Sequence, residues 1–250
     1  YNMRIAFSGT GNSGKSETIK SFLYTWKQYK QPEKTYRDIL EEEKLDHSTK
    51  TSKDTQIKIL ESLIEQVEGY TADDLIVHDR CPLDNIAYTM WCYDKDKEGF
   101  TKDFVGEQIA LMKESMRQLD IIFLCRFDPK LANDDPGPDM FIGDSVKKID
   151  KQFITEVDNI FNSILNQYMQ NPEADIFFPK GDSPVLIDLP NSAQERIDLI
   201  QQYLGNDGTL IEDEPSILSN VDELEKLLLQ QENALEAEKK EQELYKRFGI

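Results

Sequence analysis

The sequence predicts an α/β fold in which a mostly parallel sheet is covered by helices on both faces. Four short apolar runs, at residues 3–8, 74–79, 120–125 and 184–188, alternate with segments whose apolar residues recur at the helical period. A glycine-rich loop at 9–16 joins the first run to a helical segment. Alternating strands and helices favour βαβ units, which build parallel sheets buried on both sides.

The segments between the apolar runs are expected to form the covering helices. Residues at about 128–148 follow neither period and contain Pro129, Pro136 and Pro138, so we expect an irregular loop that forms a lid or stays disordered. A short strand could precede the helix at 35–44. The predicted helices cover residues 16–30, 35–44, 54–68, 83–93, 104–118, 145–170 and 192–204.

The composition favours a globular protein in the cytoplasm. Of the 250 residues, 38% are hydrophobic, and no apolar run approaches the roughly 20 residues of a membrane span. No secretory signal is visible. Cys81, Cys92 and Cys125 are far apart in the sequence, which favours reduced thiols over a zinc site. His47 and His78 are too few for a histidine-rich metal site.

The net charge of −19 disfavours an extended nucleic-acid surface, because such a surface would need clusters of Lys and Arg. The acidity is typical of a solvated surface, and it is compatible with a local basic pocket for a nucleotide.

Residues 212–250 differ from the rest of the chain. They contain eleven acidic and five basic residues, a net −6, which leaves −13 for residues 1–211. Their apolar residues predict an acidic amphipathic helix that packs on its own domain or pairs two chains through a short coiled coil. These residues are Ile217, Val221, Leu224 and Leu228, at 4-3-4 spacing.

The loop at 9–16 reads Gly-Thr-Gly-Asn-Ser-Gly-Lys-Ser and matches the phosphate-binding pattern G-x-x-x-x-G-K-[ST] at every fixed position. Such a loop (P-loop) turns its backbone N–H groups around a phosphate chain at the N-terminus of a helix. Lys15 can reach the β- and γ-phosphates, and the Ser16 hydroxyl can bind Mg²⁺. The sequence therefore predicts binding of ATP with Mg²⁺. The candidate ATP-binding residues here are Gly9, Thr10, Gly11, Asn12, Ser13, Gly14, Lys15, Ser16 and Glu17.

Charged residues follow the other predicted strands, at the edge of the sheet where ligands bind in such folds. Asp79 is expected to bind or orient Mg²⁺. Arg80 is expected to face the same crevice and hold a phosphate, or else to form a structural ion pair. Arg126 is a candidate nucleotide-binding residue. His78 alternates with Asp79, so we expect it on the covered side of the sheet without a catalytic role.

Three further blocks resemble P-loop kinases that act on nucleosides and nucleotides. Residues 79–88 (Asp-Arg-Cys-Pro-Leu-Asp-Asn-Ile-Ala-Tyr) look like D-R-x-P-L-D-x-x-A-Y. Residues 32–40 resemble the segment after the second strand of these kinases, and residues 192–197 the segment after the last strand. The chain is thus similar to the nicotinamide riboside kinase-like AAA-type family, which phages often encode. Thymidylate and deoxynucleoside kinases carry related signatures.

The resemblance implies a P-loop NTPase three-layer sandwich, with a kinase domain at 1–211 that phosphorylates a nucleoside, nucleotide or related small molecule. It implies that Glu33 or Asp38 accepts the proton of the acceptor hydroxyl. It also implies that Arg37 and Arg80 hold the acceptor or the transferring group, and that Arg196 borders the adenine. Relatives carry arginines in the lid, whereas residues 127–149 of this chain contain none.

Two other functions stay open. The first is a phage kinase that acts on a polynucleotide end or on hydroxymethyluracil in DNA, although the net charge of −19 counts against it. The second is a nucleotide-dependent switch or ATPase whose acidic tail docks on a partner.

Overall fold

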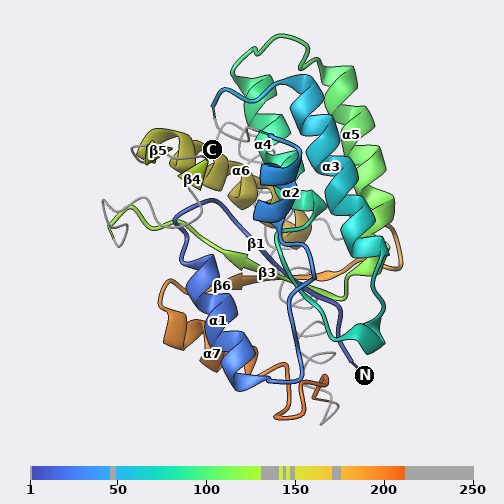
Figure 1. Ribbon diagram of the computed structural model, residues 1–250, viewed down its shortest axis with the longest axis vertical. Helices are drawn as coiled ribbons and strands as arrows, with labels where there is room; N and C mark the ends of the chain where they lie inside the picture. The colour runs from blue at the N-terminus through green and yellow to red at the C-terminus, as the bar shows by residue number, and fades with distance from the viewer. Residues whose placement is uncertain are drawn as a thin grey trace, which may run out of the picture. The chain divides into compact units, whose positions relative to one another are not determined.

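A four-stranded parallel sheet lies at the centre of the described residues (Figure 1). The computed structural model describes residues 2–45, 49–130, 150–170 and 176–211, together with the backbone of 141–142 and 145–146. The strand order is β2-β1-β3-β6, and Ile5 pairs with Val77 on one side and with Ile121 on the other. The strands are β1 (Ile5–Ser8), β2 (Val77–Asp79), β3 (Ile121–Cys125) and β6 (Val185–Leu189).

Helices cover both faces of this sheet, so the three-layer α/β prediction is confirmed (Figure 1). Helices α1 (Lys15–Thr25) and α7 (Ala193–Ile200) lie on one face. The other face carries α2 (Tyr36–Glu42), α3 (Lys53–Glu68), α4 (Pro82–Asp94), α5 (Lys102–Ser115) and α6 (Lys151–Gln170). The smaller elements are η1 (Ala72–Asp74), η2 (Met116–Gln118) and the antiparallel pair β4 (Phe141–Ile142) and β5 (Ser145–Val146).

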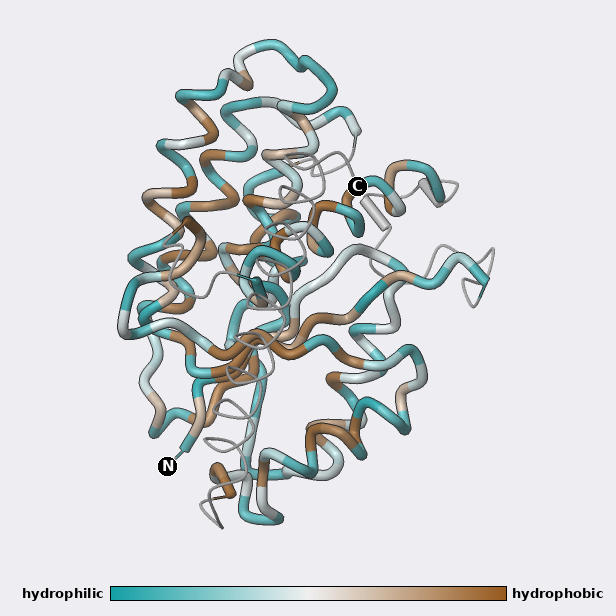
Figure 2. The backbone as a smooth tube through the Cα atoms, turned by 180° about the vertical axis from the view of Figure 1, so that it is seen from behind, coloured by the Kyte–Doolittle hydropathy of each residue, from teal (hydrophilic) through white to brown (hydrophobic). Residues whose placement is uncertain are grey.

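The central strands β1 and β3 are almost wholly apolar because both of their faces are buried. The outer strands β2 and β6 also contain His78, Asp79 and Asp188. Successive side chains point to opposite faces. Ile5 and Phe7 pack with Phe22 of α1, whereas Ala6 and Ile122 pack with the helices on the other side. The central strands accordingly form a hydrophobic band in Figure 2. Packing on both faces holds the central strands in place, and the P-loop begins at the carboxyl end of β1.

The predicted strands are confirmed, and three predicted helix boundaries are wrong. The helix expected to reach residue 204 ends at Ile200, because residues 201–203 form turns. The helix expected to reach residue 30 ends at Thr25, because the side chains of Trp26 and Tyr29 donate hydrogen bonds to carbonyl groups at Gly205 and Gly208, at 2.7 and 2.8 Å. The helix expected from residue 145 begins at Lys151. Residues 145–146 are a strand, and the Asp150 carboxylate accepts the N–H of Phe153 at the helix start.

Other predictions concern single residues, the cysteines, a possible further strand, the lid and the tail. His78 is buried in the covered sheet, as predicted, and Cys81, Cys92 and Cys125 are buried free thiols. The possible strand before α2 is limited to a single bridge between Lys30 and Ile76. Most of the predicted lid, the predicted tail helix and His47 lie outside the described residues. None of the helices in the described ranges is long and apolar enough to cross a membrane.

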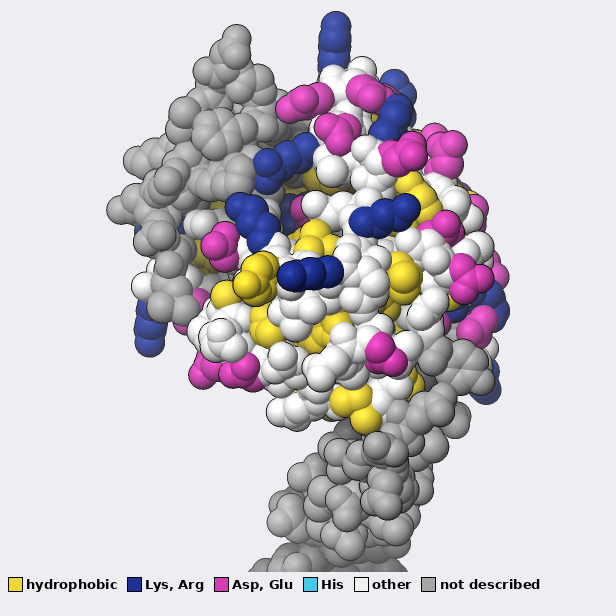
Figure 3. All heavy atoms as spheres, turned by 60° about the horizontal axis from the view of Figure 1, so that its bottom comes forward, with side chains coloured by type: hydrophobic (Ala, Val, Ile, Leu, Met, Phe, Trp, Pro, Cys, Tyr) yellow, Lys and Arg dark blue, Asp and Glu magenta, His cyan; other side chains and the backbone are white. Residues whose placement is uncertain are grey.

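Several Lys and Arg side chains lie on one face of the described residues (Figure 3). Figure 3 shows one face, on which Lys and Arg side chains lie among hydrophobic ones while Asp and Glu gather towards the margins. A net charge of −19 is therefore compatible with local positive surfaces on the described residues.

Candidate active site

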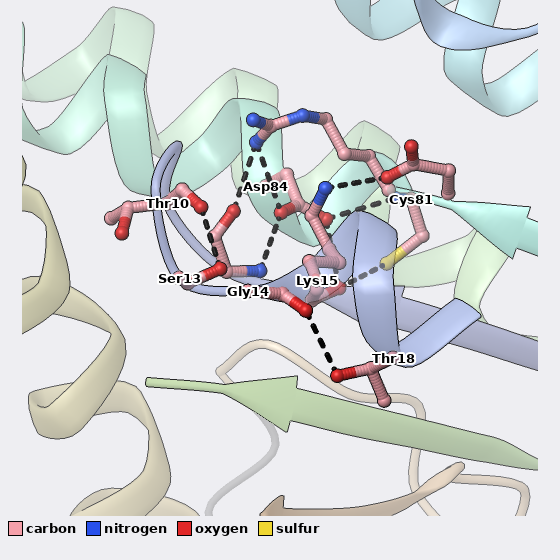
Figure 4. Close-up of polar contacts among 11 residues, drawn as sticks. Thr10, Ser13, Gly14, Lys15, Thr18, Cys81 and Asp84 are labelled. Atoms are coloured by element: carbon pink, nitrogen blue, oxygen red, sulfur yellow. Dashed lines mark hydrogen bonds and ion pairs between the residues drawn. The ribbon is translucent and has the colours of Figure 1, made fainter. Parts of the chain in front are cut away.

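The P-loop connects β1 to α1, and its first residue has a backbone conformation that requires glycine. Gly9 has φ +140°, and a Cβ there would lie 2.2 Å from the carbonyl oxygen of Cys125. Side chains of the loop and of α1 hold it further. Ser13 Oγ donates to the Thr10 carbonyl at 2.8 Å, and Thr18 Oγ1 of α1 donates to the Gly14 carbonyl at 2.9 Å (Figure 4). The loop is thus held in shape by one hydrogen bond within it and one from the helix that follows.

The structure brings together Lys15 and Asp79, two residues that the sequence singled out. The Lys15 side chain is fully buried, and its Nζ lies 2.5 Å from Asp79 Oδ1 at the end of β2. A buried ammonium group needs such a charged partner. The pair places one positive and one negative charge beside the P-loop, where a triphosphate and its metal ion would bind.

Ser16 and Asp79 are the residues that would hold Mg²⁺. Both offer oxygen atoms, and Mg²⁺ in such sites is bound through one or two carboxylates and the substrate phosphates. Asp79 is partly exposed. Among the described residues, no group of three His, Cys, Asp or Glu side chains could hold a metal. The donor set therefore fits an ion that is shared with phosphate oxygens.

Asp84, on the first turn of α4, is a residue of the site that sequence reasoning missed. Its carboxylate accepts hydrogen bonds from Ser8 Oγ at 2.8 Å, from Gly9 N at 2.9 Å and from Cys81 N at 2.9 Å. Burial raises the pKa of Asp84, while Arg80 and the two N–H donors oppose that rise. Asp84 thus joins the Asp-Arg block to the start of the P-loop. The signal was its position three residues after Cys81 at a helix start, which is typical of a capping box.

Arg80 is buried between the P-loop and two aromatic rings. Its Nη1 donates to the Gly9 carbonyl at 2.9 Å and lies 3.6 Å from Asp84. The guanidinium lies 5.0 Å from the ring centroid of Tyr36 and 5.9 Å from that of Tyr88. Arg80 therefore forms an ion pair with Asp84, which is one of the two roles that the sequence predicts for it. Contact between Arg80 and a phosphate remains a prediction.

Arg126, a candidate nucleotide-binding residue, joins the end of β3 to α6. Its Nη2 lies 2.8 Å from Asp158 Oδ2, and its Nη1 donates to Asn162 at 3.0 Å. Burial alone would lower the pKa of Arg126, but the hydrogen bonds to Asp158 raise it above its ordinary value. The guanidinium therefore supports the helix that follows the predicted lid.

Arg196, which the resemblance places beside the adenine, lies behind the P-loop. It is almost fully buried and donates to the Pro190 carbonyl at 2.6 Å and to Thr18 Oγ1 at 3.0 Å. A Cβ on Gly14 would lie 3.1 Å from its Nη1. Arg196 thus packs α7 against α1 and fills the space beside Gly14.

The predicted acceptor segment approaches the site through α2. Tyr36 contacts Arg80, which brings the start of α2 to the P-loop. Asp38 caps this helix, because its carboxylate accepts the N–H and the hydroxyl of Thr35, both at 2.7 Å. These hydrogen bonds lower the pKa of Asp38. Arg37 is half-buried, and Glu33 is exposed at a cavity of about 560 Å³ that Tyr70 also lines.

The sheet order and the P-loop define an α/β phosphate-binding-loop protein. Residues 4–162 match the AAA domain family, and the chain belongs to this family. The AAA-type resemblance is therefore confirmed. No curated protein matches the sequence.

Two solved structures of deoxyadenosine kinase from M. mycoides are similar to the chain. The one with the products dCMP and a flexible dCDP bound has 18% identity and a TM-score of 0.51, and the match covers 80% of this chain and 97% of that chain. The one with bound dCTP has 18% identity and a TM-score of 0.52, with the same coverage. At this identity the likeness establishes the fold.

Proposed function

We propose that this protein is a P-loop kinase that transfers the γ-phosphate of ATP to a hydroxyl or phosphate of a nucleoside, nucleotide or related small molecule. The observation that carries the proposal is the Lys15–Asp79 pair at 2.5 Å beside a P-loop whose start is bonded to the Asp-Arg block through Asp84. The fold of the deoxyadenosine kinases, whose structures hold dCMP, dCDP and dCTP, supports an acceptor of this class.

The protein's part in such a transfer is positioning and charge stabilisation. Backbone N–H groups of the P-loop and the Lys15 ammonium would neutralise the charge of the β- and γ-phosphates. Ser16 and Asp79 would hold Mg²⁺, which supplies further charge neutralisation. Arg80 and Arg37 would orient the acceptor and the transferring group.

The chemistry needs a base beside the acceptor hydroxyl. The acceptor oxygen forms a bond to the γ-phosphorus while the bond from that phosphorus to the β–γ bridging oxygen breaks, and ADP leaves. The hydroxyl proton passes to a carboxylate, for which Glu33 and Asp38 are the candidates. Hydrogen bonds from Thr35 lower the pKa of Asp38, which makes it a weaker base than an ordinary aspartate.

The experiment that tests the proposal follows label from γ-labelled ATP with Mg²⁺. The panel would hold ribonucleosides, deoxynucleosides, their monophosphates, nicotinamide riboside, 5′-hydroxyl oligonucleotides and hydroxymethyluracil-containing DNA. We expect label on a nucleoside-type small molecule and none with Lys15→Ala. Label on a polynucleotide alone would support the DNA-kinase alternative, and label released only as inorganic phosphate would support a switch or ATPase.

A further inference from the structure

A second cavity lies at the amino end of the sheet, opposite the P-loop. Its volume is about 520 Å³, within the range of about 300–1,000 Å³ that small-molecule sites have. Its walls come from the residues that precede three parallel strands. Asn2 and Arg4 precede β1, Tyr70 and Ala72 precede β2, and Gln118 precedes β3. Because the P-loop follows the carboxyl end of β1, this cavity is separate from the candidate active site.

The charges around this cavity disfavour a phosphate group. The Arg4 guanidinium is neutralised by Asp120, since its Nη2 lies 2.7 Å from Asp120 Oδ1 and its Nε donates to Oδ2 at 3.1 Å. Glu68 adds an exposed carboxylate to the wall. One positive and two negative side chains leave the wall with a net negative charge, which repels anions. An uncharged ligand is therefore favoured over a phosphorylated one.

The polar and aromatic side chains of the wall suit a nucleobase. Asn2 and Gln118 are half-buried, and each amide offers an NH₂ donor beside a carbonyl acceptor. Such an amide pairs with a base edge that carries a donor next to an acceptor, as adenine does at N6 and N7. The half-buried ring of Tyr70 offers a surface on which a base stacks. Two amides and one ring thus match the edge and the face of a base.

Tyr70 connects this cavity to the candidate active site. It lines both this cavity and the one beside Glu33. Its hydroxyl accepts the backbone N–H of Glu33 at 3.3 Å. Its ring centroid lies 6.0 Å from that of His78, the residue before Asp79. A molecule that stacks on Tyr70 would therefore act on the position of Glu33, a candidate base.

We propose that this cavity is a regulatory site that binds an uncharged nucleoside through its base and restrains Tyr70, and with it the segment of Glu33. The amides of Asn2 and Gln118 bind the edge of the base, and the negative wall disfavours nucleoside phosphates. The protein would thus respond to a nucleoside without binding the phosphorylated form here. Only the effect on phosphoryl transfer rests on the proposed function, because binding needs no catalysis.

Nuclear magnetic resonance of the full chain, labelled with ¹³C in its methionine methyl groups, tests binding. The probe is 5′-deoxyadenosine, which has neither a 5′-hydroxyl nor a phosphate. Met3 lines the cavity, and Met3→Leu identifies its signal. We expect a saturable shift of the Met3 signal. Gln118→Leu, which loses the amide but keeps most of the volume, should weaken this binding by about tenfold or more.

Two further variants and a charged ligand complete the binding test. Ala72→Trp fills the cavity and should abolish the Met3 shift. Gln202→Leu, in an exposed turn, is the matched control for Gln118→Leu and should bind like the wild type. AMP, which adds a phosphate, should bind about tenfold more weakly or less at Met3. Thermal unfolding checks each variant, and if Ala72→Trp does not fold, Gln118→Leu carries the test.

The regulatory role is tested by phosphoryl transfer to the acceptor found with labelled ATP. We expect 5′-deoxyadenosine to raise kcat by about twofold or more, because it restrains the segment of Glu33, and we expect Gln118→Leu to reduce this effect. Competition at the acceptor site would instead raise KM in the wild type and in both variants alike.

The absence of a Met3 shift would overturn the inference, and so would equal affinity in Gln118→Leu or equally tight binding of AMP. A Met3 shift without a change in kcat would overturn the regulatory role. A wild type that phosphorylates no acceptor would overturn the proposed function, while the titration at Met3 would still decide whether the cavity binds a nucleoside.

Discussion

The carboxylate of Asp84 accepts the backbone N–H of Gly9 at 2.9 Å, across 75 positions of sequence. The same carboxylate accepts Ser8 Oγ, so Asp84 of α4 holds both the last residue of β1 and the first residue of the P-loop. A shift of α4 would therefore move the loop. This contact connects α4, where we expect the acceptor, to the P-loop, where we expect the triphosphate.

Replacing Asp84 by Asn should weaken both stability and nucleotide binding. The amide keeps one acceptor oxygen, but its NH₂ group cannot accept the hydrogen bonds that the second carboxylate oxygen receives from Ser8 and Cys81. A buried donor left unpaired costs about 1–3 kcal/mol. We expect a lower Tm and a raised KM for ATP. Asp182→Asn, at an exposed carboxylate that contacts Arg117, is the matched control and should change neither.

Lys15→Ala should abolish phosphoryl transfer. The change removes the ammonium that would face the β- and γ-phosphates and leaves the Asp79 carboxylate without its 2.5 Å partner. Loss of one preorganised charge of this kind lowers kcat by roughly 10²–10³-fold. Steady-state transfer with ATP and Mg²⁺ measures the effect, and turnover near that of the wild type would refute the assignment of the site.

Arg37→Ala should separate a kinase from a switch. In a kinase whose acceptor lies beside α2, transfer to the acceptor falls sharply while the KM for ATP changes by less than about twofold. In a switch, ATP hydrolysis would survive and no acceptor would be involved. Arg117→Ala, at a surface ion pair with Glu114, is the control for loss of a charge. Undiminished acceptor phosphorylation in Arg37→Ala would exclude the role given to Arg37.

The contact between α4 and α6 should depend on pH through Glu156. Hydrogen bonds from Lys95, Trp91 and Gln152 lower the pKa of Glu156 from 4.5 to about 2. Because the pKa is lower in the folded state, these interactions stabilise the fold above pH about 4.5 and are lost as pH falls towards 2. Urea unfolding should find Glu156→Gln less stable than the wild type at pH 7, with a difference that shrinks below pH 4.5. A constant difference would contradict this account.

Removing residues 213–250 should leave triphosphate binding intact, because every motif of the candidate site lies upstream of residue 212. Titration of the truncated chain with an ATP analogue measures this. If the truncated chain folds but binds the analogue much more weakly, residues 213–250 contribute to the site.

The fold and the central part of the site could be predicted because their signals are local. The apolar runs indicate buried strands, and the G-x-x-x-x-G-K-S pattern indicates the phosphate-binding loop that contains Lys15. Asp79 could be paired with that loop because parallel strands end at the same edge of a sheet. The structure confirms this pairing, with Nζ of Lys15 on Asp79 Oδ1.

The partners of the other charged residues could not be predicted, because they come from distant parts of the chain. Arg126, at the end of β3, binds Asp158 of α6, which lies 32 residues away, and Arg196 binds Thr18, 178 residues away. The sequence shows an arginine at a strand end, but the packing of the helices determines whether that arginine binds a carboxylate or a ligand. The early end of α1 has the same origin, since Trp26 bonds to Gly205.

The most direct test of the kinase account is the ratio of inorganic phosphate to ADP produced from ATP and Mg²⁺ in the presence of a nucleoside and nucleotide mixture. A kinase passes the γ-phosphate to the acceptor, so we expect ADP to form with almost no inorganic phosphate. We expect ADP and the phosphorylated acceptor both to be absent with Lys15→Ala. Inorganic phosphate released in an amount equal to ADP, whatever acceptor is present, would contradict the account and identify the protein as an ATPase.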